Sequence, residues 1–150
     1  MPKRISVALL GVMALLVSSC DTGPHAAAGF RLPPGGSPEQ GKADFVAFGC
    51  ATCHEVSGLA LPKPTVQPPV PVVLGGPVDS PMTDGYLVTS IIYPSYRLAG
   101  HPQSQIAVNG ESRMPHDYAA KMTVQQLTDI VAFLQAQYVV RRTLPDYGYR

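Results

Sequence analysis

The density of proline in the middle third of the chain limits its fold more than any other feature. Seven prolines interrupt residues 56–81, at Pro62, Pro64, Pro68, Pro69, Pro71, Pro77 and Pro81. Each removes a backbone donor and fixes φ, so no regular helix or central strand passes through this segment. The whole chain holds 16 Pro and 14 Gly among 150 residues. We therefore expect one domain of short helices joined by long irregular segments.

The charge content argues against nucleic acid as a partner. Charged residues make up 14% of the chain, and the formal net charge is +1. The sequence has no basic stripe, which a nucleic-acid-binding domain needs to neutralise phosphates. We expect recognition of partners to depend on local charge instead.

The first 20 residues have the plan of an export signal. A basic start at Lys3 and Arg4 is followed by an apolar run over residues 5–17, and small residues then precede Cys20. This order is that of a secretory signal. The apolar run is about 13 residues long, shorter than the roughly 20 that span a bilayer as a helix. We predict that residues 1–19 are removed after export.

Residues 17–20, Val-Ser-Ser-Cys, resemble the lipobox of bacterial lipoproteins. The resemblance implies that Cys20 becomes a lipidated N-terminus with two or three acyl chains, since a single chain anchors a protein only weakly. Asp21 resembles the signal for retention at the inner membrane. The alternative is an ordinary signal peptide in which Cys20 is incidental. Residues 20–37 are rich in Gly, Pro and Ala, and we expect them to form a flexible tether.

Local signals predict two short helices in the first two thirds of the chain. Ser37 is a good cap, Pro38 suits the first helical position, and the helix would continue to Gly49. A second helix covers residues 83–93 and ends there, because the residue before a proline avoids the helical region. We expect residues 94–121 to form a loop.

The final helix has the clearest signal. Thr123 and Gln126 have the spacing of a capping box at its start. Apolar residues then recur at helical spacing and form one stripe: Val124, Leu127, Ile130, Val131, Leu134 and Tyr138. We expect this stripe to face the core and residues 141–150 to form a polar tail.

The strongest chemical motif is Cys-x-x-Cys-His at Cys50, Cys53 and His54, the attachment signature of c-type haem. Two thiols three residues apart on one turn can each bond a vinyl group of the haem, and the next residue presents its imidazole to the iron. A redox dithiol would need a βαβ framework, and a zinc site would need another Cys or His pair. Only His101 and His116 remain, well separated in sequence. We therefore predict one covalent haem c.

The sixth coordination position of the iron has several candidate ligands. We favour Met114, because it lies in the Ser-Arg-Met-Pro segment over residues 112–115, where the proline stiffens the backbone just after the thioether. The other candidates are Met82, Met122, His101 and His116. We interpret the other two methionines as packing residues and His116 as a surface residue. An open sixth position is the remaining alternative.

Together these features resemble a class I monohaem cytochrome c over residues 38–138. The matching features are a helix with Gly41 and Phe45 that leads to the Cys-x-x-Cys-His motif, a Met-Pro loop, and a final helix over residues 127–134. Residues 86–99 also resemble the cytochrome c domain that is fused to some terminal oxidase subunits.

The resemblance implies an all-α fold over residues 38–140. In the class I cytochrome c fold the N- and C-terminal helices cross near a right angle, and short helices and long Pro-rich loops wrap one haem. Carried over to this chain, Gly41 and Phe45 would meet Ile130 and Phe133.

The resemblance also implies two further contacts of the haem site. The family has a proline carbonyl that accepts the proximal imidazole N–H, and residues 70–75 approximate its run. We assign this role to Pro71, with Pro68 or Pro69 as alternatives. Arg97 follows the second helix, where such folds often hold haem propionates, and we expect it either to pair with one or to be solvated.

The function that the resemblance implies is electron transfer and not catalysis, because two axial ligands leave no position for a substrate. The expected partners are redox proteins, a donor dehydrogenase and an acceptor oxidase or reductase, on the periplasmic side of the bacterial inner membrane. Two alternatives stay open. One is a haem c subunit of a periplasmic dehydrogenase or terminal oxidase complex, and the other is a haem sensor or peroxidase with an open sixth site.

Overall fold

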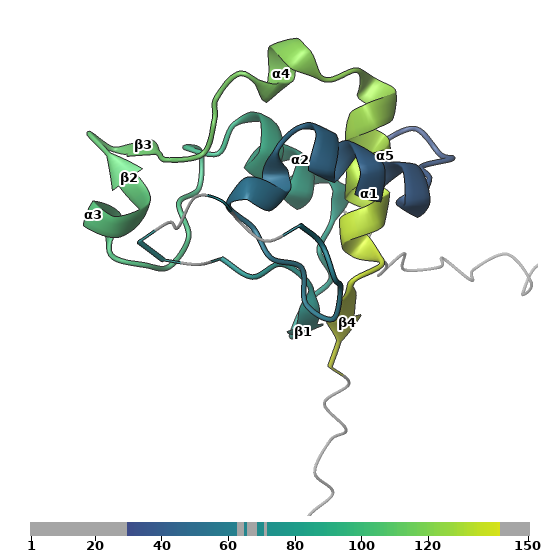
Figure 1. Ribbon diagram of the computed structural model, residues 1–150, viewed down its shortest axis with the longest axis horizontal. Helices are drawn as coiled ribbons and strands as arrows, with labels where there is room; N and C mark the ends of the chain where they lie inside the picture. The colour runs from purple at the N-terminus through teal and green to yellow at the C-terminus, as the bar shows by residue number, and fades with distance from the viewer. Residues whose placement is uncertain (1–29, 63–64, 66–68, 71, 142–150) are drawn as a thin grey trace, which may run out of the picture.

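The computed structural model describes residues 30–62, 65, 69–70 and 72–141 (Figure 1). Its elements are α1 Pro38–Ala47, η1 Cys50–Thr52, β1 Gly76–Val78, α2 Asp84–Ile92, α3 Gln103–Ile106, β2 Ala107–Val108, β3 Glu111–Ser112, α4 Tyr118–Lys121, α5 Val124–Gln135 and β4 Tyr138–Val140. The predicted signal, Cys20, the first part of the predicted tether and residues 142–150 lie outside the described residues. Within the part that is described, no helix is both long and apolar enough to cross a membrane.

The three predicted helices begin where their caps predict. The side chains of Ser37, Thr83 and Thr123 each accept a hydrogen bond from a backbone N–H in the first turn of α1, α2 and α5. The capping box at the start of α5 is complete. The final helix ends at Gln135, so Tyr138, which we predicted in its apolar stripe, begins strand β4 instead.

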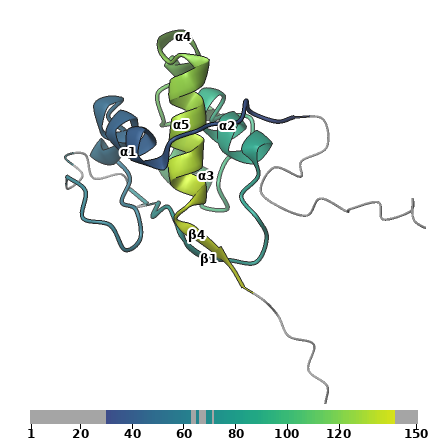
Figure 2. The same ribbon diagram turned by 90° about the vertical axis from the view of Figure 1, so that its right-hand side faces the viewer.

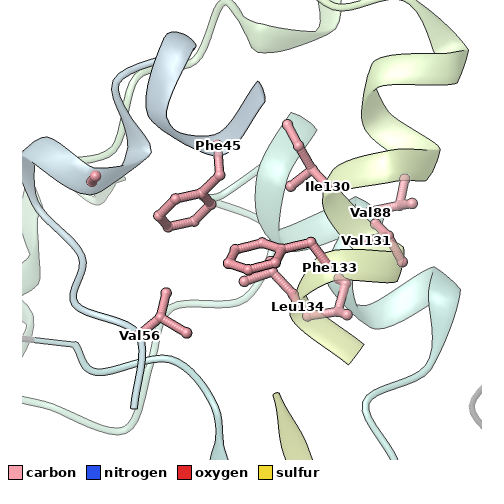
Figure 3. Close-up of a cluster of buried hydrophobic side chains, with 9 residues drawn as sticks. Phe45, Val56, Val88, Ile130, Val131, Phe133 and Leu134 are labelled. Carbon is pink, nitrogen blue, oxygen red and sulfur yellow. The ribbon is translucent and has the colours of Figure 1, made fainter. Parts of the chain in front are cut away.

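The core lies where α1 and α2 meet α5, and the 3₁₀ turn η1, which follows α1, adds Ala51 to it. Its buried hydrophobic residues are Phe45, Ala51, Val56, Leu87, Val88, Ile130, Val131, Phe133 and Leu134. The rings of Phe45 and Phe133 lie together, with centroids 5.6 Å apart (Figure 3). In Figure 1 α1 runs across α5, and Gly41 lies at the contact. Gly41 and Phe45 therefore both meet Phe133, and Gly41 also meets the backbone of Asp129.

The all-α prediction needs a correction, because the described residues also form two small sheets. β1 and β4 pair in parallel, with Gly76 opposite Tyr138, and β2 and β3 form an antiparallel hairpin. These strands have only two or three residues each, too few for an alternating apolar pattern to reveal them. Pro77 is tolerated in β1 because both strands of a two-stranded ribbon are edge strands.

The segment predicted as a loop over residues 94–121 contains α3, the hairpin and α4. Asn109 and Gly110 connect β2 to β3, with φ values of 51° and 84°. An Asn-Gly pair between two strands is a strong local signal for a two-residue hairpin, since both positions need positive φ. This pair is the sequence feature from which the hairpin before Met114 can be recognised.

Residues 30–37, which we expected in the tether, lie against the helices. The Leu32 N–H donates to the buried Asp84 carboxylate at 3.1 Å, and the Ser37 N–H donates to the Asp129 carboxylate at 2.7 Å. Asp84 also accepts from the Gln135 side chain at 2.8 Å. Figure 2 shows this arm crossing α5 on its way to α1. The arm is thus attached to α2 and α5 before the first helix begins.

Candidate functional site

The Cys-x-x-Cys-His motif lies on a tight turn directly after α1. Gly49 adopts the left-handed conformation, with φ of 76°, and redirects the chain into η1. The Cys50 carbonyl then accepts backbone hydrogen bonds from Cys53 at 3.3 Å and from His54 at 3.0 Å. Both cysteines are half-buried free thiols. The turn therefore places two thiols and an imidazole within one short segment, as attachment of a haem requires.

Cys50 is a neutral thiol in this environment. Burial raises its pKa to about 11, although backbone and Tyr118 hydrogen bonds act in the opposite direction. Thiols of redox dithiols have lowered pKa values, because the thiolate is the attacking species. The surroundings of Cys50 thus argue against the redox-dithiol alternative.

Tyr118 in α4 is a site residue that the sequence did not indicate. Its side chain is buried, and its hydroxyl donates to the Phe48 carbonyl at 3.4 Å. It also lies close enough to the Cys50 side chain for the two groups to interact electrostatically. Burial, followed by the proximity of Cys50, raises the pKa of Tyr118 to about 12. This contact joins residues 68 positions apart, and no local pattern can reveal it.

His54 is held in one tautomer by a backbone carbonyl. Its Nδ1 lies 3.0 Å from the carbonyl oxygen of Val72. A carbonyl only accepts, so Nδ1 carries the proton and Nε2 keeps its lone pair for a metal. Pro71, which we predicted as the acceptor, lies outside the described residues, and the contact in the structure belongs to the next residue. Successive carbonyls of an extended chain point in opposite directions, so the sequence alone does not fix this register.

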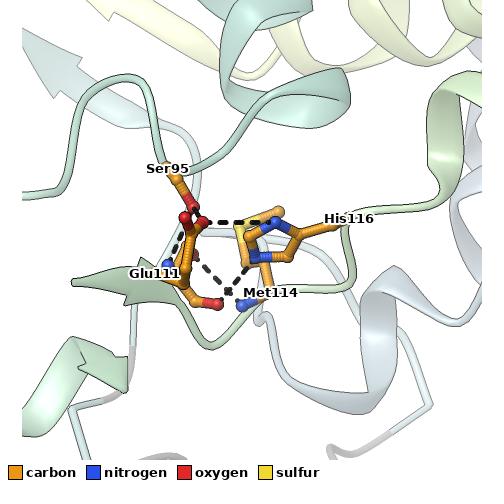
Figure 4. Close-up of polar contacts among 5 residues, drawn as sticks. Ser95, Glu111, Met114 and His116 are labelled. Carbon is orange, nitrogen blue, oxygen red and sulfur yellow. Dashed lines mark hydrogen bonds and ion pairs between the residues drawn. The ribbon is translucent and has the colours of Figure 1, made fainter. Parts of the chain in front are cut away.

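The Met114 loop is braced by polar contacts (Figure 4). The Met114 N–H donates to the Ser112 hydroxyl at 3.2 Å, and the Ser112 N–H donates to the Ser95 hydroxyl at 2.9 Å. Ser95 in turn donates to the Glu111 carboxylate at 2.5 Å. The loop is therefore tied to the segment that follows α2. The sequence did not point to Ser95 or Glu111, because their contact joins separate segments.

The other candidate ligands have different environments. Met82 and Met122 pack against the hydrophobic core. His101 is exposed. His116 is also exposed, with its Nε2 2.9 Å from the Ser112 carbonyl and its Nδ1 3.6 Å from the Glu111 carboxylate. Met114 is half-buried and does not belong to the core cluster of the described residues. Of the three candidate methionines, Met114 is therefore the one that does not pack against the hydrophobic core.

Two further expectations concern the surroundings of the site. Arg97 is exposed, in the segment that follows the exposed rings of Tyr93 and Tyr96. Among the described residues, no three His, Cys, Asp or Glu side chains gather into a group that could hold a metal ion.

The residues present fit the predicted haem c. Cys50 and Cys53 are unpaired in the structure, and the proton of His54 is engaged at Nδ1. A family model described as Cytochrome c matches residues 38–137. This match contains the Cys-x-x-Cys-His motif, Val72 and Met114. No curated protein and no solved structure matches the chain.

Proposed function

The chain belongs to the cytochrome c family, which binds haem c covalently, and from this premise we propose that it is a membrane-anchored electron carrier with one haem. In this proposal Cys50 and Cys53 form the two thioethers, and His54 and Met114 are the axial ligands. When bound, haem c supplies a one-electron couple between ferrous and ferric iron.

The observation that carries the proposal is the hydrogen bond from His54 to the Val72 carbonyl, at 3.0 Å. Ligating histidines almost always donate their second ring N–H to such an acceptor, which fixes the ring and raises its basicity. The contact therefore supports His54 as a metal ligand directly after two free thiols.

A braced Met114 supports a carrier in preference to a sensor or peroxidase. A thioether is a weak ligand, so it stays bound when its loop is held in place. The hydrogen bonds through Ser112 and Ser95 provide this restraint. Thioether ligation also raises the reduction potential.

The proposed location is the periplasmic side of the bacterial inner membrane. Support comes from the export signal over residues 1–19, the lipobox at Cys20, and Asp21. The partners in this proposal are a donor dehydrogenase and an acceptor oxidase or reductase. Electron transfer needs no substrate position on the iron, so we propose a carrier and not an enzyme.

Optical spectroscopy of the exported, haem-loaded protein tests the axial ligands. Ferric haem with Met ligation has a weak long-wavelength charge-transfer band, and we expect this band in the natural chain and its loss in Met114→Ala. Met82→Leu and Met122→Leu are the matched controls, because Leu replaces Met at similar volume in the core. A band that persists in Met114→Ala, or high-spin spectra in the natural chain, would contradict the His54 and Met114 ligand set.

A further inference from the structure

The segment that supplies the acceptor for His54 leads into β1, which pairs with β4 in the residues after α5. Residues 72–78 are attached in three successive places. Val72 accepts from His54, Leu74 forms a parallel bridge with Val56, and β1 pairs with β4. Figure 2 shows β1 and β4 side by side below α5. The chain thus connects the imidazole of the motif to the C-terminal segment.

Backbone hydrogen bonds fix residues 72–78 at both ends. On the motif side, the Leu74 N–H donates to the Glu55 carbonyl at 2.9 Å. On the C-terminal side, the Gly76 N–H donates to the Gln137 carbonyl at 2.9 Å, and the Arg141 N–H donates to the Val78 carbonyl at 2.8 Å. β1, at the end of this segment, therefore depends on the C-terminal residues for its pairing.

The ribbon is also packed closely where it leaves α5. A Cβ at Gly75 would lie 3.0 Å from Gln137 Cβ and 3.2 Å from the Gln137 carbonyl oxygen. The Gln137 side chain donates to the Phe133 carbonyl at 3.2 Å, within the last turns of α5. The path of residues 72–78 is consequently set by the end of the final helix.

We propose that the C-terminal ribbon, residues 137–141, positions the proximal imidazole. It holds β1, and with it the segment of residues 72–75, in place, so that the Val72 carbonyl stays on the His54 Nδ1–H. This inference rests on the proposed function, in which His54 ligates the iron. A hydrogen bond at Nδ1 raises the basicity of the ligand, and a more basic ligand favours the ferric state. Loosening the ribbon therefore raises the reduction potential.

Two truncations of the haem-loaded protein test the role of the ribbon. Ending the chain after Gln137 removes β4 and the Arg141 donor, whereas ending it after Arg141 keeps both. The measurements are the reduction potential and the hydrogen exchange of the His54 Nδ1 proton by NMR. We expect an upward shift of the potential and faster exchange for the first truncation only.

A pair of glycine substitutions covers the case in which the shorter chain fails to fold. Gly75 and Gly58 have similar positive φ values, 81° and 75°, so alanine strains both backbones alike. Of these two glycines, Gly75 has other atoms within 4 Å of the position of an added Cβ, and Gly58 has none. We expect Gly75→Ala to raise the potential and speed the exchange of the imidazole proton, and Gly58→Ala to leave both near the natural values.

The outcomes separate this inference from the proposed function. If the haem is attached and His54 ligates it, but Gly75→Ala behaves like Gly58→Ala and a folded truncation after Gln137 behaves like its control, the ribbon has no positioning role and the carrier proposal stands. If the natural chain carries no haem on its two thiols, both ideas are wrong.

Discussion

Gly41 in α1 lies directly against the backbone carbonyl of Asp129 in α5. A Cβ on Gly41 would sit 1.9 Å from that oxygen and 2.8 Å from Phe133 Cβ. No side chain fits in this space, so the close approach of the two helices depends on glycine. The contact matters for the site because Cys50 follows α1 after only two residues.

We expect Gly41→Ala to destabilise the protein by about 3 kcal/mol, since overpacking at a rigid backbone contact outweighs the gain in helix propensity. The measurement is the free energy of unfolding in denaturant, followed by circular dichroism. Lys42→Ala, at an exposed position of the same helix, serves as the control. Equal stability of the two variants would show that the helices can separate at no cost.

The Ser95 hydroxyl links the Met114 loop to the segment after α2. Ser95→Ala removes the bonds to Glu111 and to the Ser112 N–H. Each hydrogen bond contributes about 1 kcal/mol. Because the two bonds together hold the loop closed, we expect added imidazole to displace Met114 up to about thirtyfold more readily, as measured by titration of the ferric spectrum.

Two variants serve as references for the Ser95 prediction. Ser95→Thr keeps a hydroxyl and should restore the natural affinity for imidazole. Ser90→Ala removes an exposed hydroxyl in α2 that bonds only within its helix, to the Tyr86 carbonyl. If Ser95→Ala and Ser90→Ala bind imidazole with equal affinity, Ser95 does not restrain the Met114 loop.

Asp84 attaches the N-terminal arm to the helices. Its buried carboxylate accepts from the Leu32 N–H and from the Gln135 side chain. Asp84→Ala removes the acceptor of the Leu32 N–H and leaves the Gln135 amide with the Met82 carbonyl, so we expect a loss of about 2 kcal/mol in unfolding free energy. Asp79→Ala, which breaks only an exposed ion pair with Arg141, should cost well under about 1 kcal/mol. Thermal or denaturant unfolding distinguishes the two, and similar losses would contradict the role of Asp84.

Tyr118 should make stability depend on alkaline pH. Burial raises its pKa from 10.0 to about 12, so the folded protein holds the phenol proton more tightly than the unfolded chain does. The stabilising contribution is complete below pH 10 and is lost as the pH rises from 10 to 12. In the haem-loaded protein the Cys50 sulfur is a thioether and no longer titrates. Burial then remains the main cause of the raised pKa of Tyr118.

Unfolding free energies across this pH range test the Tyr118 prediction. Tyr118→Phe should show a weaker fall in stability than the natural chain. Part of the fall should persist, because burial also raises the pKa of Tyr138. Tyr93→Phe, at an exposed ring, should behave as the natural chain. An unchanged pH dependence in Tyr118→Phe would contradict the assignment.

Local sequence signals predicted the features that depend on interactions between residues close together in the sequence. Ser37, Thr83 and Thr123 mark helix starts, because a cap acts within one turn. The Cys-x-x-Cys-His spacing likewise predicts the haem site from five consecutive residues. These features needed no knowledge of distant contacts.

Long-range contacts could not be predicted in the same way. The acceptor Val72 is 18 residues from His54, and β4 pairs with β1 across most of the domain, with Gly76 opposite Tyr138. Tyr118, Ser95 and the ribbon after α5 act across such separations. Their roles depend on tertiary packing, and tertiary packing leaves no pattern in the neighbouring residues of the sequence.

Mass spectrometry of the mature, exported protein tests the central claim most directly. We expect the peptide with Cys50 and Cys53 to carry one haem, bound through both sulfurs. The same peptide with two unmodified thiols, or with a disulfide between them, would contradict the proposed electron carrier.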